Sequence, residues 1–201
     1  MNIVRTTCGI VLFAAILACA KPPLFPKDVM RGVDTNFDFN AWRVASASMT
    51  GRKVQIGGRI LEGQSGGEGI LIVGRQLPIV ERPAYGPSAS QRKPGVGAYE
   101  FAVSYPGEIE SSALSNGNRF IAIGITQLPK PVTVDGATRI DPVLLAQCVH
   151  IWKTRGGDIA DFQSAGAGYQ ALEEATYCTD RGTTRPSPEN SREFITSDVT
   201  R

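Results

Sequence analysis

The sequence predicts a mainly β protein, built as a small, strongly bent antiparallel sheet of five strands or as an OB-like barrel. A short N-terminal helix and a C-terminal extension complete the predicted fold. Three observations support this class. The 201 residues include 22 glycines and 13 prolines, which is high for a helical protein and typical of a chain with many turns. The apolar runs are short and bounded by turn residues. Several runs contain an internal glycine, which often marks a bulge or a bend.

Each predicted strand is a run of alternating or continuous apolar residues. In the first run Val54, Ile56 and Ile60 fall on one face. The glycine-rich stretch Gly63–Gly67 is the predicted turn after it, and residues 78–97 form a predicted loop. The five predicted strands cover residues 53–61, 69–77, 98–105, 119–126 and 143–152.

The segments that flank these strands have a different character. Phe39, Trp42 and Val44 have loosely helical spacing and predict a short helix within residues 37–49. Residues 154–178 are predicted to be a segment packed on the sheet, with a helix near Tyr169–Tyr177. Residues 179–201 are polar, contain two prolines and predict a disordered tail.

The N-terminus has the features of an export signal. Arg5 precedes an uncharged run from Cys8 to Ala20. As a helix this run spans about 20 Å, which is short of a membrane crossing. A cleaved signal peptide over residues 1–18 is therefore predicted. The alternative is a buried core helix, which the abrupt stop at Lys21-Pro22-Pro23 disfavours.

The run ends in Ile16-Leu17-Ala18-Cys19, which resembles the lipobox of bacterial lipoproteins. This pattern predicts cleavage between Ala18 and Cys19 and a diacylglyceryl group on the Cys19 thiol. Further acylation of the new amine would hold the protein on the outer membrane, because two or three chains anchor stably where one does not. Ala20, in place of an inner-membrane retention Asp, predicts transport to the outer membrane. Residues 19–36 are the predicted tether.

The two remaining cysteines predict a disulfide bond. Cys8 leaves with the signal and Cys19 takes the lipid, so Cys148 and Cys178 are left in a compartment that oxidises thiols. A bond between them would stabilise the fold by roughly 3–4 kcal/mol on the chain-entropy model. The alternative is a pair of buried free thiols.

Four stretches of the chain resemble the Slp family of outer-membrane lipoproteins, named for a starvation- or stationary-phase-induced lipoprotein. The resemblance covers about residues 39–152 and defines a Slp-like β-domain over residues 37–153. It implies an envelope lipoprotein, and it supplies no catalytic residues. The matching stretches are Gly51–Val54 with Gly57–Ile60, Leu77-Pro78, Gly117–Gly124, and Asp141–Val143 continuing to His150-Ile151-Trp152.

Two patterns that suggest chemistry have simpler explanations. Gly63–Gly67 fits the G-x-S-x-G elbow around Ser65, but a strand follows instead of the required helix, so we predict a hairpin turn. The acids Asp158, Asp161, Glu173 and Glu174 lack the spacing of a cation-binding loop, which indicates a solvated face. No catalytic, cofactor or metal residue is predicted.

The only histidine, His150, shares a strand face with Cys148 and Trp152. We expect this face to be a partly buried seam, covered by the C-terminal segment through the disulfide. A small binding patch is the alternative.

Taken together, these patterns predict a non-enzymatic protein that is lipid-anchored to the outer membrane, faces the periplasm, and serves the envelope or a starvation response. The formal net charge of +2 and the lack of a basic cluster argue against a nucleic-acid partner. The alternative is a binding module that holds a small ligand, a glycan or an envelope protein on the barrel surface.

Overall fold

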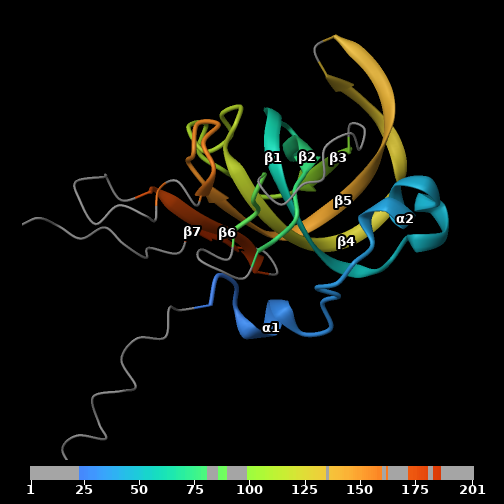
Figure 1. Ribbon diagram of the computed structural model, residues 1–201, viewed down its shortest axis with the longest axis horizontal. Helices are drawn as coiled ribbons and strands as arrows, with labels where there is room; N and C mark the ends of the chain where they lie inside the picture. The colour runs from blue at the N-terminus through green and yellow to red at the C-terminus, as the bar shows by residue number, and fades with distance from the viewer. Residues whose placement is uncertain are drawn as a thin grey trace, which may run out of the picture.

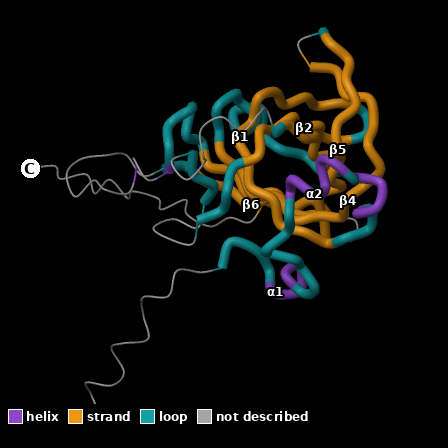
Figure 2. Tube along the Cα trace, turned by 45° about the vertical axis from the view of Figure 1, so that its right-hand side comes forward, coloured by secondary structure: helices purple, strands orange, loops and turns teal. Residues whose placement is uncertain are grey.

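The computed structural model shows seven strands in one sheet and two short helices (Figures 1 and 2). It describes residues 23–80, 86–89, 99–134, 136–159, 162, 172–180 and 183–186. The helices are α1 (Lys27–Met30) and α2 (Phe39–Val44), and a 3-10 turn follows at Ser46–Met49. The strands are β1 (Lys53–Gly66), β2 (Gly69–Gln76), β3 (Glu100–Tyr105), β4 (Arg119–Val134), β5 (Ala137–Trp152), β6 (Glu174–Asp180) and β7 (Thr183–Pro186).

Five of the strands close into a ring. The sheet order is β3-β2-β1-β4-β5-β6-β7, and β3 also pairs with β5, so that β1-β2-β3-β5-β4 forms a closed barrel. The predicted mainly β fold with a small OB-like barrel is confirmed. One pair departs from the expected antiparallel pattern: the closing β3–β5 pair is parallel, from Ala102↔Val143 to Ser104↔Leu145.

Internal glycines make the tight curvature of the barrel sterically possible. Gly58 and Gly74 face the ring of Phe120, and a Cβ on either glycine would lie 2.8 or 2.7 Å from it. Gly124 lies where the β4–β5 register shifts, and a Cβ there would overlap the backbone oxygen of Leu145. These glycines mark bends and a bulge, as their positions inside strands predicted.

The barrel interior is filled by aromatic and branched aliphatic side chains. Helix α2 adds Phe39 and Trp42, and the connection between β3 and β4 adds Ile109 and Leu114. The helix begins at Asp38, whose side chain accepts a hydrogen bond from Ala41 N, as an N-cap does. The helix expected within residues 37–49 is therefore confirmed. The strand residues of this core include Val54, Ile56, Ile60, Ile72, Phe101, Val103, Phe120, Leu144, Val149 and Ile151.

A second, smaller core lies on the outer face of the barrel. Phe25 and Val29, from the segment around α1, are 4% and 3% exposed. They belong to one cluster with Ile121, Ile123 and Trp152 of β4 and β5. The prediction that residues 19–36 are a free tether is wrong from Leu24 onward, because this apolar segment packs against the barrel wall and continues to a bridge between Asp34 and Val54.

The C-terminal segment packs on the barrel as expected, but as strands. Strand β6 pairs with β5 from Cys148↔Cys178 to Trp152↔Glu174, so the helix expected near Tyr169–Tyr177 is wrong from Glu174 onward. The predicted disordered tail is also wrong where β6 reaches Asp180 and β7 adds Thr183–Pro186. The remainder of that tail lies outside the described residues. The physical reason is that β3 pairs with β5 only as far as Leu145. Beyond that residue the same edge of β5 can pair with β6.

Strands β4 and β5 run on past the ring as a two-stranded hairpin, which we call the arm (residues 127–142; Figure 1, upper right). The predicted strands stopped at Thr126 and began at Val143, because Pro129, Pro131 and Pro142 disfavour a strand. At the other hairpin, β1–β2 pairing continues to Gly66↔Gly69, so the turn is tighter than the predicted Gly63–Gly67.

We expect Gly124→Ala to destabilise the barrel by about 2–3 kcal/mol, because the new methyl group meets backbone atoms that cannot move away. Gly66→Ala is the matched control, since nothing lies within 4 Å of the position that its new methyl group would take; it should change stability by less than about 1 kcal/mol. Urea unfolding followed by circular dichroism measures both. Equal stabilities of the two variants would contradict the steric argument.

Candidate functional site

The predicted disulfide is present. Cys148 of β5 and Cys178 of β6 lie directly opposite each other, with their Cα atoms 4.1 Å apart, and they are bonded. Cys148 is fully buried within the outer core. The bond therefore fastens β6 to the barrel at the point where β6 takes over the edge of β5.

His150 lies beside this bond and acts as a structural link. Its Nδ1 lies 2.6 Å from Oγ1 of Thr176 in β6, and that hydroxyl donates to the backbone oxygen of Leu24 at 3.2 Å. A hydroxyl has a single hydrogen, so Nδ1 of His150 must donate to Oγ1. The chain of hydrogen bonds connects β5, β6 and the N-terminal segment.

The rest of the His150 ring is enclosed. The side chain is 5% exposed, its ring meets Trp152 edge-on at 4.2 Å, and Phe25 lies 6.3 Å away. Nε2 is 3.7 Å from Oε2 of Glu174 and makes no hydrogen bond among the described residues. The seam expected around Cys148, His150 and Trp152 is present, and it is covered by β6 and by the N-terminal segment.

The structure does not bring Ser65 to the histidine. Ser65 pairs with Ile70 across the β1–β2 hairpin, and a strand follows it. Within the described ranges, the hydrogen-bond and ring contacts of His150 come from Phe25, Trp152 and Thr176. The two groups that a hydrolase would need together thus have separate surroundings.

The acidic residues of the C-terminal segment are dispersed. Asp158 accepts hydrogen bonds from Ser88 Oγ and Ala89 N, both at 3.0 Å, and so joins the β2–β3 connection to the loop after β5. Glu173 pairs with Lys153, and Glu174 faces His150. Asp161 lies outside the described residues. In the described part of the chain, no group of three potential metal ligands comes together.

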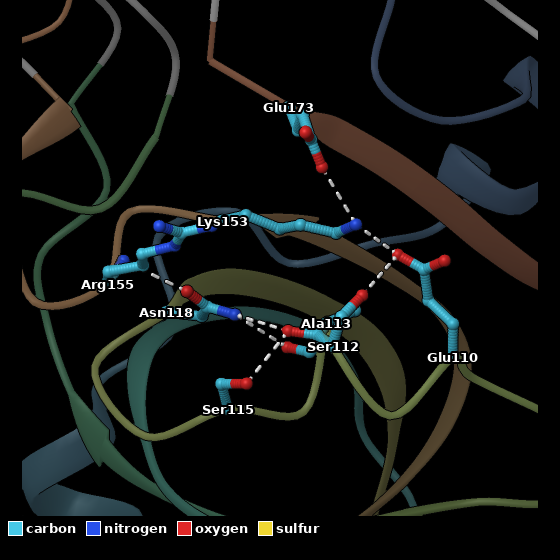
Figure 3. A network of polar contacts seen from close by, with 8 residues as sticks. All are labelled: Glu110, Ser112, Ala113, Ser115, Asn118, Lys153, Arg155 and Glu173. Atoms are coloured by element: carbon cyan, nitrogen blue, oxygen red, sulfur yellow. Dashed lines mark hydrogen bonds and ion pairs between the residues drawn. The ribbon is translucent and has the colours of Figure 1, made fainter.

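A polar network that the sequence did not predict lies near the start of β4 (Figure 3). Asn118 is 1% exposed, and its amide donates to the backbone oxygens of Ser112 and Ala113 at 3.2 and 3.0 Å. Its Oδ1 accepts from Arg155 N at 3.0 Å. Asn118 thus ties the β3–β4 connection to the loop after β5. The only signal in the sequence was Gly117-Asn118, which is also common in ordinary turns.

Lys153 forms the charged part of the same network. Its Nζ contacts Glu110 and lies 2.9 Å from Glu173 Oε2, as Figure 3 shows. The hydrogen bond from Lys153 lowers the pKa of Glu110, and the same bond raises the pKa of Lys153. Nearby, burial raises the pKa of Tyr105 to about 12, so this phenol stays neutral at physiological pH. The network orders three segments of the chain.

The arm has a covered face and an exposed face. On the covered face, Val132 packs with Val73, Ala102 and Val143 on the outside of the barrel wall. Arg139 contacts Glu100 of β3, which also pairs with Arg75 at 3.1 Å. These contacts hold the arm against β2 and β3.

The exposed part of the arm carries apolar side chains beside the hydrogen-bonded pair Thr133 and Thr138. Ile140 is 74% exposed and Leu128 58% exposed, and Ile140 lies directly across from exposed Pro131. Apart from Val44 on α2, the exposed large hydrophobic residues of the described chain all belong to β4 and β5; they are Leu128, Ile140 and Leu145. Apolar side chains gathered on one element are typical of a contact surface.

Ala18 and Cys19, the predicted cleavage and lipidation residues, lie outside the described residues. Within the described segments, none of the helices has the length and hydropathy needed to cross a membrane.

The fold and its contacts define a disulfide-linked OB-like barrel with an arm and an outer core. Comparison with known proteins adds no closer assignment: the chain matches no protein-family model, no curated protein and no solved structure.

We expect Glu110→Gln to lower stability by less than about 1 kcal/mol at pH 7, since the carboxylate is half exposed and its ion pair is screened by solvent. The folded-state pKa of Glu110 is below the ordinary 4.5, so its contribution is present above that value and is lost as the pH falls through the folded-state pKa.

Thermal unfolding from pH 7 to pH 3 measures this difference. Wild type and Glu110→Gln should converge at the acidic end. Glu108→Gln, an exposed change in the same loop, should follow the wild type at every pH. A gap between wild type and Glu110→Gln that persists at pH 3 would refute the assignment to the ion pair.

Proposed function

We propose that this protein is a lipid-anchored lipoprotein of the bacterial outer membrane, with a non-catalytic β-domain that faces the periplasm. The Cys148–Cys178 bond carries the proposal, because structural disulfides persist in oxidising compartments outside the cytosol. The export signal over residues 1–18 and the lipobox ending at Cys19 supply a route to such a compartment. The resemblance to the Slp family points to a role in the envelope under starvation or in stationary phase.

The non-catalytic part of the proposal rests on where the polar side chains are used. His150 joins β5, β6 and the N-terminal segment, and Lys153 and Asn118 order loops. Catalysis needs a nucleophile, a base and an orienting group that converge on one open position. These side chains hold secondary structure elements together instead.

The intact mass of the protein extracted from membranes tests the anchor and the compartment together. We expect a chain that begins at Cys19 and carries added acyl mass. Reduction should add about 2 Da, as expected when one disulfide takes up two hydrogens. A Cys19→Ala variant should keep its signal and lose the acyl mass. An unacylated wild-type chain that retains Met1–Ala18 would overturn the proposal.

The exposed face of the arm favours a second role, the binding of an envelope protein. Residues 127–142 contain leucine, isoleucine, valine and proline but no aromatic residue. Exposed aliphatic side chains such as Leu128 and Ile140 offer apolar area that a protein groove can bury, and they carry no polar group that could bind the hydroxyls of a glycan.

For this role we expect a photoreactive residue at Thr138, on the arm, to crosslink to an envelope protein in living cells. Leu128→Ser combined with Ile140→Ser should abolish the adduct, because both apolar contacts are lost. Val44→Ser removes a similarly exposed apolar side chain from α2 and should leave the adduct intact. An adduct that survives the double substitution would exclude the arm as the contact.

A further inference from the structure

The N-terminal segment is fixed to the barrel almost immediately after the predicted lipid anchor. Leu24 accepts a hydrogen bond from Thr176, and Phe25 is buried in the outer core. Only four residues lie between Cys19 and Leu24, so five Cα–Cα steps join them. Fully extended, they reach roughly 18 Å.

This reach is short compared with the domain. A compact domain of about 150 residues has a radius of gyration near 15 Å, which corresponds to roughly 40 Å across. A chain segment that reaches about 18 Å cannot pass around a domain of this width. The side that carries Leu24 and α1 must therefore stay next to the membrane that holds the acyl chains.

The surface at this side carries exposed basic groups. Lys27 is the first residue of α1 and Arg31 directly follows the helix, and both side chains are exposed. Lys53 lies beside them, with its Nζ donating to the backbone oxygen of Arg31 at 3.2 Å.

Acidic residues at this side only partly offset the basic ones. Asp28 is exposed, but it is one position on from Lys27 and so projects in another direction around the helix. Asp34 is paired with Arg52 at 2.8 Å. Glu174 faces His150 beside Phe25. Counting Lys27, Arg31, Arg52 and Lys53 against Asp28, Asp34 and Glu174 leaves four positive and three negative charges, a net charge of +1, which suits an anionic surface.

The arm lies on the opposite side of the molecule. In both views α1 is at the bottom and the arm is at the top, and the second view is turned about the vertical axis (Figures 1 and 2). The vertical separation of α1 and the arm is therefore a property of the molecule and not of one projection.

We propose that the face formed by α1 and its flanking residues, marked by Lys27 and Arg31, lies on anionic phospholipid headgroups of the membrane that holds Cys19, and that the arm points away from that membrane. This inference rests on the proposed function, because it needs the acylated Cys19. It goes further by fixing the orientation of the barrel and the lipid chemistry of its contact.

Energy transfer from the protein to the bilayer tests this orientation. The acylated protein, with its mass verified, is placed in vesicles that contain a headgroup-labelled acceptor. A donor is attached through an azide-bearing residue at Thr35, near α1, or at Thr138, on the arm; both positions are exposed. We expect strong transfer from Thr35 and weak transfer from Thr138. Equal transfer, or stronger transfer from Thr138, would overturn the proposed orientation.

Charge reversal tests the lipid chemistry. On vesicles rich in phosphatidylglycerol, Lys27→Glu should shift the balance between docked and undocked barrels by at least about fivefold, seen as weaker transfer from Thr35. Lys27→Glu combined with Arg31→Glu should shift it further. Lys130→Glu, the same charge change on the arm, should have no effect, and on phosphatidylcholine vesicles all variants should match the wild type.

The outcomes separate the two proposals. A protein without acyl mass overturns the proposed function and, with it, this orientation. An acylated protein whose Thr35 transfer is insensitive to Lys27→Glu and Arg31→Glu on anionic vesicles overturns the headgroup contact alone.

Discussion

The rest of the structure depends on how the two edges of β5 are paired. One edge pairs with β4 along the length of the barrel, while the other pairs first with β3, through Ser104↔Leu145, and then with β6 from Cys148↔Cys178. The first contact closes the ring. The second supplies partners to backbone groups that β3 leaves unpaired, and these groups would be costly to bury alone. The disulfide lies at this exchange, so the closure of the barrel and the docking of the C-terminal strands are parts of one arrangement.

A second layer of packing follows from that exchange. The outward-facing side chains Ile121, Ile123 and Trp152 would expose a large apolar surface if the barrel stood alone. Phe25 and Val29 cover it, and the hydrogen bonds among Leu24, Thr176 and His150 fix the cover in place. His150 is therefore best understood through the three segments that it joins, and its Nδ1 is the donor to Thr176 because that hydroxyl has a single hydrogen.

The barrel was largely predictable because its strands carry strong local signals. The apolar alternation at Val54, Ile56 and Ile60, and the glycines inside β1 and β4, report local backbone geometry. The cysteine pairing followed from counting thiols. The arm was missed because Pro129, Pro131 and Pro142 are normally signs of an edge or a loop, and here they lie on a ribbon that leaves the ring. The packing of Phe25 in the cluster that contains Trp152 and the buried role of Asn118 could not be predicted, since both depend on contacts between segments far apart in the chain.

The attachment of Leu24 to Thr176 also determines how the protein responds to mechanical force. If Cys19 carries the proposed acyl chains, a pull on them reaches the described part of the chain near Leu24 and passes to β6 through the Thr176 hydroxyl. Hydrogen bonds in that path can yield, but β6 is joined to β5 by the covalent bond between Cys148 and Cys178. The N-terminal segment can therefore detach from the barrel wall and lengthen the connection to Cys19, while β6 remains covalently linked to the barrel.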